Sequence, residues 1–259
     1  MANIHHTARV SSEAVLAPDV EVDEFTLIGP HVVIGGGTYI GPFTRIEGPT
    51  TIGERNRFVA YASIGSPPQD LKYKGERTEL HIGNENVFRE FVTINRGTAG
   101  GGGRTTLGSG NFFMAYSHVA HDCHVGDGTI FANNATLAGH VDIGDFATIG
   151  AFSAIHQFCR VGDHAFVGGA TIATQDVLPY VKTVGSRPAA TYGINSIGLE
   201  RKGFQPETIE ALQRAYRILV RSKLKLEDAL QRIESELGVH AETRYLIEFV
   251  RTAKRGVIR

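Results

Sequence analysis

Histidines and one aspartate gather in three short segments of the chain, and their side chains could perform acid–base chemistry. His121 is followed directly by Asp122. A neutral imidazole beside a carboxylate suits a general base, because the carboxylate orients the ring and stabilises its cation. The other polar candidates in the segments HVAHDCHVG, NNATLAGHV and AFSAIHQFCRVG are His118, His140, His156 and Gln157.

A six-residue repeat predicts where these side chains lie. A large apolar residue recurs every six positions, and a small or β-branched residue usually follows four positions later. Neither a helix (period 3.6) nor a simple strand (period 2) has this spacing. We predict short strands and corners, with three units closing an 18-residue coil and coils stacking about 4.8 Å apart. The glycines that often follow the repeated residue suit corners that need a positive φ or a close backbone approach. The repeated residues are Ile4, Val10, Leu16, Val22, Ile28, Ile34, Ile40, Ile46, Ile52, Phe58, Ile64, Ile82, Phe88, Ile94, Leu107, Phe113, Val119, Val125, Phe131, Leu137, Ile143, Ile149, Ile155, Val161 and Val167.

Residues 18 positions apart lie above one another in such a coil. His121 therefore stacks under Gly139, and Asp122 stacks under His140. Three interpretations of this corner are open at this point. The first is a general base with the Gly139 N–H as oxyanion donor. The second is a zinc site of the kind that γ-carbonic anhydrases build from three histidines across a subunit boundary, and the third is a set of hydrogen-bonded histidines at an interface.

Two interruptions and a tail break the repeat. The polar stretch at about 65–81 and the glycine-rich stretch at about 97–106 predict loops that leave the prism, and loops on a rigid scaffold often carry function. We expect a β-helical domain at 1–185, followed by a connector and a C-terminal helical domain at 186–259. Helices are expected from Pro206 to about 221, over KLEDALQRIESELG up to Gly238, and from about 241 to 254.

Composition excludes several classes of protein. The 259 residues carry a formal net charge of −1, whereas nucleic-acid-binding domains are usually basic. The N-terminal segment lacks the pattern of a secretory leader, and no apolar run approaches the length of a membrane span. We expect a cytoplasmic protein that binds no nucleic acid and does not insert into a membrane. Cys123 and Cys159 are two coils apart, too far for a disulfide, and are expected to be buried.

The three segments, in this order, resemble one family. Together with PPQDLKYKGE upstream and GINSIGLERKGF downstream, they are similar to the UDP-N-acetylglucosamine O-acyltransferases, which open lipid A synthesis in Gram-negative bacteria. The likeness runs from the first hexad to the terminal helices. It implies a mainly β fold, a left-handed parallel β-helix of hexapeptide repeats with a C-terminal helical domain, assembled as a homotrimer. It implies no metal and no diffusible cofactor.

The resemblance also implies roles for individual residues. His121 would be the general base that takes the proton from the glucosamine 3-hydroxyl of UDP-N-acetylglucosamine. That hydroxyl would attack a (3R)-3-hydroxyacyl thioester on acyl carrier protein, while Asp122 orients the base and Gly139 donates to the oxyanion. The implied substrate-binding residues are Gln69, Asp70, Lys72, His118, His140, His156, Gln157, Gly169, Asn195, Arg201 and Lys202. Gly169 would leave the acyl groove long.

This sequence departs from the family pattern at two positions. Asn95 stands in FVTINRGT where well-known members have histidine, and Ile197 stands where a glutamate near the ribose is usual. A 3-amino sugar is an alternative acceptor. A zinc-dependent γ-carbonic-anhydrase-like trimer and a catalytically silent scaffold are the alternatives from other classes. We further expect the segment Asp70–Lys72 to leave another part of the coil than the histidines, so that a neighbouring subunit completes a groove between them.

Overall fold

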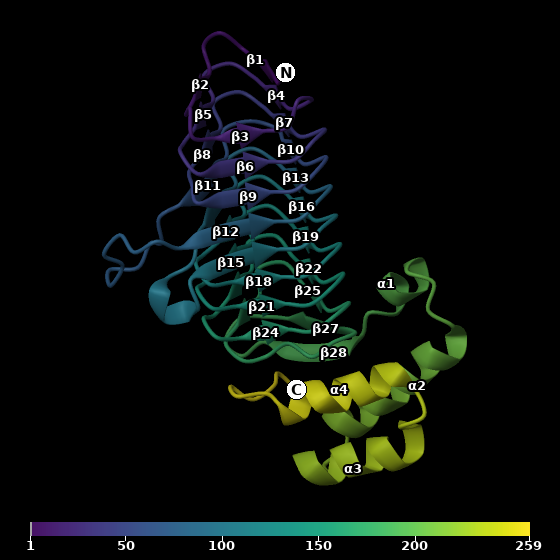
Figure 1. Cartoon of the computed structure of the whole chain (residues 1–259). Coiled ribbons are helices and arrows are strands. Elements are labelled where there is room, and N and C mark those ends of the chain that lie inside the picture. Colours follow the sequence, from purple (N-terminus) through teal and green to yellow (C-terminus); the bar gives the residue numbers. More distant parts are fainter. Residues whose placement is uncertain (1) are drawn as a thin grey trace.

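The computed structural model describes residues 2–259 and contains a triangular prism of three parallel sheets (Figure 1). Up to β26, successive strands lie on successive sides, so that each sheet takes every third strand, and β27 and β28 then both join sheet A. Sheet A contains β1 (Asn3–Ile4), β4 (Glu21–Val22), β7 (Tyr39–Ile40), β10 (Arg57–Phe58), β13 (Val87–Phe88), β16 (Phe112–Phe113), β19 (Ile130–Phe131), β22 (Thr148–Ile149), β25 (Phe166–Val167), β27 (Val181–Val184) and β28 (Ala190–Ile194). Sheet B contains β2 (Arg9–Val10), β5 (Leu27–Ile28), β8 (Arg45–Ile46), β11 (Ser63–Ser66), β14 (Thr93–Asn95), β17 (His118–Val119), β20 (Thr136–Leu137), β23 (Ala154–Ile155) and β26 (Ile172–Ala173). Sheet C contains β3 (Val15–Leu16), β6 (Val32–Ile34), β9 (Thr50–Ile52), β12 (Glu79–Ile82), β15 (Arg104–Leu107), β18 (His124–Val125), β21 (Asp142–Ile143) and β24 (Arg160–Val161).

The strand register confirms the 18-residue coil. Tyr39 pairs with Arg57, and Phe112 pairs with Ile130, so equivalent residues of uninterrupted coils are 18 positions apart. The repeated apolar residues point into the prism and stack along its axis. Four fully buried rings form one such column, with neighbouring centroids 4.5–5.0 Å apart: Phe58, Phe88, Phe113 and Phe131. Ile4 in the first coil is 43% exposed, because no preceding coil covers it.

The corners of the prism correct one expectation about glycine. Most corner residues with positive φ are not glycine, as in Phe25 (φ 55°), Phe43 (φ 56°) and His140 (φ 61°). Equivalent side chains stack from coil to coil, and the Phe25 and Phe43 rings lie 5.1 Å apart, a contact that offsets the cost of the left-handed conformation. The glycines after the repeated residue serve the other expected purpose. A Cβ on Gly41 would overlap the carbonyl oxygen of Val59 in the next coil.

Two excursions interrupt the coils, and both are shorter than predicted. The protruding excursion (residues 67–78) joins β11 to β12, and the compact excursion (residues 96–103) joins β14 to β15 and contains a 3₁₀ turn at Ala99–Gly101. They lengthen the offset between equivalent residues to 30, from Arg57 to Val87, and to 25, from Val87 to Phe112. The predicted bounds were too wide because residues 79–82 and 104–107 pair with each other in sheet C despite their polar side chains.

Helices cover the C-terminal end of the prism (Figure 1). They are α1 (Ser196–Arg201), α2 (Pro206–Tyr216), which continues as a π-helical turn at Arg217–Arg221, α3 (Leu226–Leu237) and α4 (Ala241–Arg251). The helix α1 begins where the predicted connector (residues 185–196) ends and precedes the first predicted helix, which was expected to begin at Pro206. Sheet A also extends past residue 185, because β28 pairs antiparallel with β27. Buried apolar residues of the last coil, including Leu178 and Val181, pack against the helices. Among the described residues, no helix is long and apolar enough to cross a membrane.

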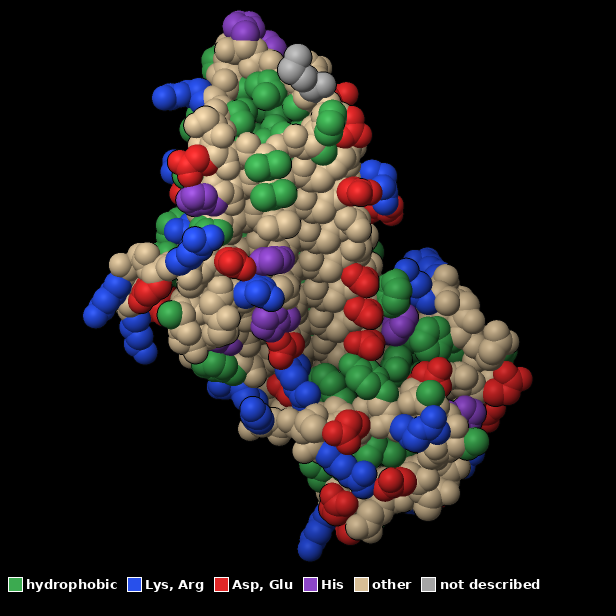
Figure 2. Space-filling model, in the orientation of Figure 1, with side chains coloured by type: hydrophobic (Ala, Val, Ile, Leu, Met, Phe, Trp, Pro, Cys, Tyr) green, Lys and Arg blue, Asp and Glu red, His purple; other side chains and the backbone are tan. Residues whose placement is uncertain are grey.

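The polar side chains that face the reader in Figure 2 gather on the middle of the prism, over sheet C, whereas apolar side chains gather near the N-terminal tip. Val15 and Val33 of sheet C, near that tip, are 61% and 42% exposed. Cys123 and Cys159 are buried free thiols, as predicted. Burial raises the pKa of Cys123 to about 12 and that of Cys159 to about 11, so neither thiol is a nucleophile at neutral pH.

Candidate active site

His121 and Asp122 form a hydrogen-bonded pair at the edge between sheets B and C, which we call the B–C edge. They follow β17 and precede β18, and His121 Nδ1 lies 2.7 Å from Asp122 Oδ2. An ionised carboxylate can only accept, so the neutral imidazole carries its proton on Nδ1 and keeps a lone pair on Nε2. The side chain of Asp122 is completely buried. The pair therefore has the chemistry of an oriented general base.

Thr98 of the compact excursion holds this carboxylate in place. Its backbone N–H donates to Asp122 Oδ1 at 2.7 Å, and its hydroxyl donates to Oδ2 at 2.6 Å. The same hydroxyl accepts from the N–H of Gly101 and so caps the 3₁₀ turn. The backbone N–H of Asp122 in turn donates to the Thr105 hydroxyl at 2.8 Å. Neither threonine was predicted as a site residue, although a threonine before a glycine-rich turn is a recognisable cap.

Gly139 lies directly beside the His121 ring, as the 18-residue stacking predicted. A Cβ on Gly139 would stand 2.6 Å from His121 Cε1 and 2.8 Å from Nε2. Any side chain at this position would therefore displace the ring from its place against Asp122. Within residues 2–259, no carbonyl or side chain accepts a hydrogen bond from the Gly139 N–H, and Gly139 is buried.

His140 occupies the next coil above Asp122. Its ring meets His121 edge to face, with centroids 5.1 Å apart, and its Nε2 lies 3.8 Å from Asp122 Oδ2. Phe158, one coil further, stacks on His140 with centroids 4.5 Å apart. This stacking on the Phe158 ring restricts the orientation of the His140 ring. Phe158 was not among the predicted site residues, although it stands 18 residues after His140.

Three more predicted residues lie near this edge. His118 lies in β17, and its Nδ1 is hydrogen-bonded to the Thr93 hydroxyl at 2.7 Å. Burial lowers the pKa of His118, which favours its neutral form. His156 and Gln157 are exposed two coils after His121, and His156 Nδ1 lies 3.2 Å from the backbone oxygen of Gln157. The structure therefore brings the predicted corner together.

The predicted position of the protruding excursion was wrong. We expected Asp70 and Lys72 to leave another part of the coil, but the excursion starts after a sheet B strand and ends at a sheet C strand. It therefore leaves the B–C edge, two coils before His121. The error arose because the repeat is lost between Ile64 and Ile82, so the sequence did not show which corner had been lengthened. Gln69, like Lys72, is exposed on this excursion.

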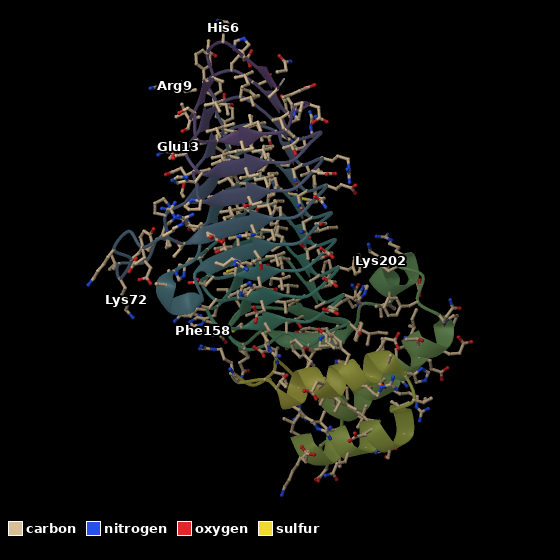
Figure 3. All side chains as sticks on the ribbon, viewed as in Figure 1. His6, Arg9, Glu13, Lys72, Phe158 and Lys202 are labelled. Atoms are coloured by element: carbon tan, nitrogen blue, oxygen red, sulfur yellow. The ribbon has the colours of Figure 1, made fainter. Side chains whose placement is uncertain are left out.

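The remaining predicted residues lie on other edges of the same chain. Gly169 is at the edge between sheets A and B. Asn195 donates from Nδ2 to the backbone oxygen of His164, at the edge between sheets C and A. Arg201 is the last residue of α1 and Lys202 follows it, and Figure 3 shows Lys202 on the opposite side of the prism from Lys72. One chain does not bring these groups to the His121 corner.

The two departures from the family pattern differ in their surroundings. Asn95 is buried, and its Nδ2 donates to the backbone oxygen of Pro67 at 3.0 Å, at the start of the protruding excursion. The Asn95 side chain therefore contacts the protruding excursion and is not exposed to solvent. Ile197 is 62% exposed on α1, so its side chain is free to face a ligand but cannot hydrogen-bond to one.

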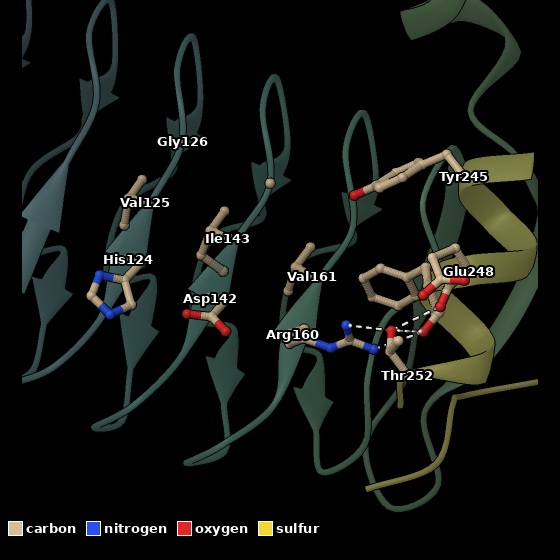
Figure 4. A pocket seen from close by; sticks show the side chains of 12 residues that line it. His124, Val125, Gly126, Asp142, Ile143, Arg160, Val161, Tyr245, Glu248 and Thr252 are labelled. Carbon is tan, nitrogen blue, oxygen red and sulfur yellow. Dashed lines mark hydrogen bonds between the residues drawn. The ribbon is translucent and has the colours of Figure 1, made fainter. Parts of the chain in front are cut away.

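Two grooves lie close to this region. One, of about 460 Å³, is lined by Gly101, Asp122, His140, Phe158 and Lys254, among others. Of the dyad, only Asp122 lines this groove. The other, of about 410 Å³, lies between sheet C and α4 (Figure 4). It contains none of the predicted site residues.

Ligand atoms of His121, Asp122 and His140 lie within 4.8 Å of one another, close enough to hold a transition metal. However, both carboxylate oxygens of Asp122 already accept hydrogen bonds, from Thr98 and from His121. A metal would have to displace one of these donors. The residues therefore fit a hydrogen-bonded dyad better than a zinc site.

Comparison with known protein families defines the class of protein. A model described as bacterial transferase hexapeptide (six repeats) matches residues 104–139. A second model, described as UDP-N-acetylglucosamine O-acyltransferase, domain 2, matches residues 176–258. The chain is thus a hexapeptide-repeat transferase with the left-handed parallel β-helix of that class.

Full-length relatives define the family. An acyl-[acyl-carrier-protein]–UDP-N-acetylglucosamine O-acyltransferase of Thiobacillus denitrificans is 53% identical over 259 residues, which cover 100% of both chains. The structure of a UDP-N-acetylglucosamine O-acyltransferase from Moraxella catarrhalis has a TM-score of 0.96 at 41% identity and covers 99% of both chains. That of a UDP-N-acetylglucosamine acyltransferase from Francisella novicida has a TM-score of 0.96 at 36% identity, covering 99% of this chain and 94% of the other. The chain belongs to the UDP-N-acetylglucosamine O-acyltransferase family and is an acyltransferase.

Proposed function

We propose that this chain transfers a (3R)-3-hydroxyacyl group from acyl carrier protein to the 3-hydroxyl of the glucosamine in UDP-N-acetylglucosamine, the first step of lipid A biosynthesis. The observation that carries the proposal is the His121–Asp122 dyad with the free N–H of Gly139 beside its ring. Acyl transfer needs a base and an oxyanion donor on the two sides of one reacting carbonyl.

The reaction follows from this arrangement. His121 Nε2 takes the proton of the sugar 3-hydroxyl, and the oxygen attacks the thioester carbonyl carbon. The resulting oxyanion accepts a hydrogen bond from the Gly139 N–H, and Asp122 stabilises the imidazolium. The tetrahedral intermediate then expels the carrier thiolate, which takes the proton back from His121. Every atom and proton is accounted for by the two substrates and this one histidine.

The substrate is held by groups on three parts of the chain in this proposal. Gln69, Asp70 and Lys72 bind the sugar nucleotide from the protruding excursion. His118, His140, His156 and Gln157 surround the sugar and the diphosphate on the B–C edge. Lys72 and Lys202 lie on opposite sides of one prism (Figure 3). We therefore propose a homotrimer, in which Asn195, Arg201 and Lys202 of a neighbouring subunit complete the uridine end.

Gly169 supports a long acyl groove. A Cβ there would meet only backbone atoms of Ala151, at 3.3 and 3.9 Å. A larger side chain would thus project from the edge between sheets A and B, and glycine leaves that surface free. We propose that the acyl chain runs along it.

Mass spectrometry of the product tests the whole proposal. The protein is incubated with UDP-N-acetylglucosamine and 3-hydroxyacyl carrier proteins of several chain lengths, and the 3-amino analogue of the sugar is offered in a parallel reaction. We expect an ester of UDP-N-acetylglucosamine. Absence of any acylated sugar would refute the proposal, and a product only from the 3-amino sugar would change the acceptor.

A further inference from the structure

We propose that Arg96 is a positioning residue that fastens the protruding excursion to the prism and thereby sets the affinity for the sugar nucleotide. The fastening follows from contacts within the chain. Its consequence for affinity rests on the proposed function, in which Asp70 and Lys72 bind that nucleotide.

The Arg96 side chain joins two parts of the chain that are otherwise separate. Nη1 donates to the backbone oxygen of Gly65, just before the excursion begins, at 2.8 Å. Nη2 donates to the Tyr73 hydroxyl, in the middle of the excursion, at 3.2 Å. The guanidinium carbon also lies 5.9 Å from the centre of the Tyr73 ring. Because the guanidinium is planar and rigid, these contacts fix the distance between the two segments.

Tyr73 passes this constraint to the candidate substrate-binding residues. Its backbone N–H donates to the backbone oxygen of Asp70 at 3.0 Å, which closes a turn over residues 70–73. Inside the turn, the Lys72 N–H donates to Asp70 Oδ1 at 2.9 Å. The Tyr73 hydroxyl donates to the backbone oxygen of Glu76 at 2.8 Å, on the returning arm. Tyr73 therefore contacts both arms of the excursion, Asp70 through its backbone N–H and Glu76 through its hydroxyl, and Arg96 holds that hydroxyl.

Few other contacts hold this excursion. The side chain of Leu71, between the two charged candidates, is fully exposed. Asn95 fastens only the first residue of the excursion, Pro67. Pro68 and Thr78 are buried near the two ends of the excursion, but the residues between them are mostly exposed. Such a segment samples many conformations, and a binding group on it costs ordering entropy when the ligand arrives. Preorganisation by Arg96 removes part of that cost.

Arg96 and Thr98 are two residues apart but serve different halves of the site. Arg96 contacts the protruding excursion, whereas Thr98 contacts Asp122. Loss of the Arg96 contacts should therefore weaken nucleotide binding without disturbing the base. Loss of the Thr98 hydroxyl should disturb the base. This separation distinguishes positioning of the excursion from a general structural effect.

Limited trypsin digestion tests the fastening without any assay of activity. Lys72, Lys74 and Arg77 place three cleavage sites in the excursion. We expect Arg96→Lys and Tyr73→Phe to raise the cleavage rate there about tenfold, because each removes a hydrogen bond that opposes local opening. Arg232→Lys, at an exposed position of α3, is the matched control. Cleavage at the wild-type rate in both excursion variants would overturn the inference, and Tyr73→Phe decides the matter if Arg96→Lys does not fold.

Steady-state kinetics test the consequence. We expect Arg96→Lys and Tyr73→Phe to raise KM for UDP-N-acetylglucosamine about five- to tenfold while kcat and its pH profile stay close to wild type. Thr98→Val should instead lower kcat and shift that profile. A pH profile changed by Arg96→Lys in the same way would overturn the separate positioning role. Faster cleavage with an unchanged KM would overturn the effect on affinity, and a chain without acyltransferase activity would refute the proposed function while the digestion still decides the fastening.

Discussion

Two excursions leave the B–C edge in adjacent coils, and they meet the rest of the molecule in different ways. The compact excursion folds back onto Asp122, where Thr98 supplies two hydrogen bonds and Gly101 packs against the carboxyl group. The protruding excursion points away from the prism (Figure 1) and is held mainly through Tyr73. The shorter insertion therefore holds the carboxylate of the dyad in place, and the longer one leaves most of its side chains exposed.

The difference follows from what each excursion can bury. A buried carboxylate needs donors, because an unsatisfied charge in the interior is costly. The compact excursion supplies them and has little freedom to vary. The tip of the protruding excursion buries almost nothing, so its conformation depends on a few hydrogen bonds. Substitutions in the first should change kcat, and substitutions in the second should change KM.

The largest effect is expected at the base that the compact excursion supports. His121→Ala should lower kcat by about 10²–10⁴-fold, as loss of a general base usually does. His124→Ala removes an exposed histidine of sheet C three residues later and should leave kcat within about threefold of wild type. The two rates are compared under saturating substrates. A fully active His121→Ala enzyme would end the assignment of this residue.

A pair of adjacent glycines tests the contact between the compact excursion and the dyad. A Cβ on Gly101 would overlap the Asp122 carboxyl group, whereas a Cβ on Gly100 would meet nothing within 4 Å. Gly101→Ala should therefore displace the carboxylate and lower kcat about ten- to a hundredfold. Gly100→Ala should stay within about twofold. Equal kcat values in the two variants would show that the excursion does not control the base.

The protruding excursion should respond in KM instead. Lys72→Met removes a charge proposed to bind the nucleotide and should raise KM for UDP-N-acetylglucosamine about fivefold with little change in kcat. Lys74→Met makes the same change two residues away at another exposed position and is the control. A fall in kcat without a rise in KM would place Lys72 with the reacting groups. It would contradict the prediction that the protruding excursion affects KM and the compact excursion affects kcat.

The smallest effect concerns stability against pH at His118. Its pKa is lowered by burial, so the folded chain binds fewer protons than the unfolded chain below the ordinary histidine value of about 6.5. Stability should therefore fall as the pH drops from 7 to 5. His118→Gln should reduce that loss by less than about 1 kcal/mol. Denaturant unfolding at the two pH values measures it, with the exposed His124→Gln as control. An unchanged or steeper loss in His118→Gln would contradict this prediction.

Much of the site could be predicted from the sequence because the repeat has a fixed length. A fixed 18-residue coil converts a position in the chain into a position on the prism, so His121, Gly139 and the Asp122–His140 stack followed from counting. Counting by 18 residues failed where the repeat is interrupted. It did not show that the protruding excursion leaves the B–C edge, nor that Thr98 returns to Asp122.

What the sequence determined by itself is periodic. The strands, the inward apolar columns and the histidine corner follow from side chains that recur at the coil length, since each coil imposes the same geometry on the next. What only the tertiary structure decided is local and irregular. The hydrogen bonds of Thr98 and Arg96, the stacking of Phe158 on His140, and the helix α1 depend on backbone paths without a repeat. Such contacts join residues whose separation in the chain obeys no rule, and only the folded chain brings them together.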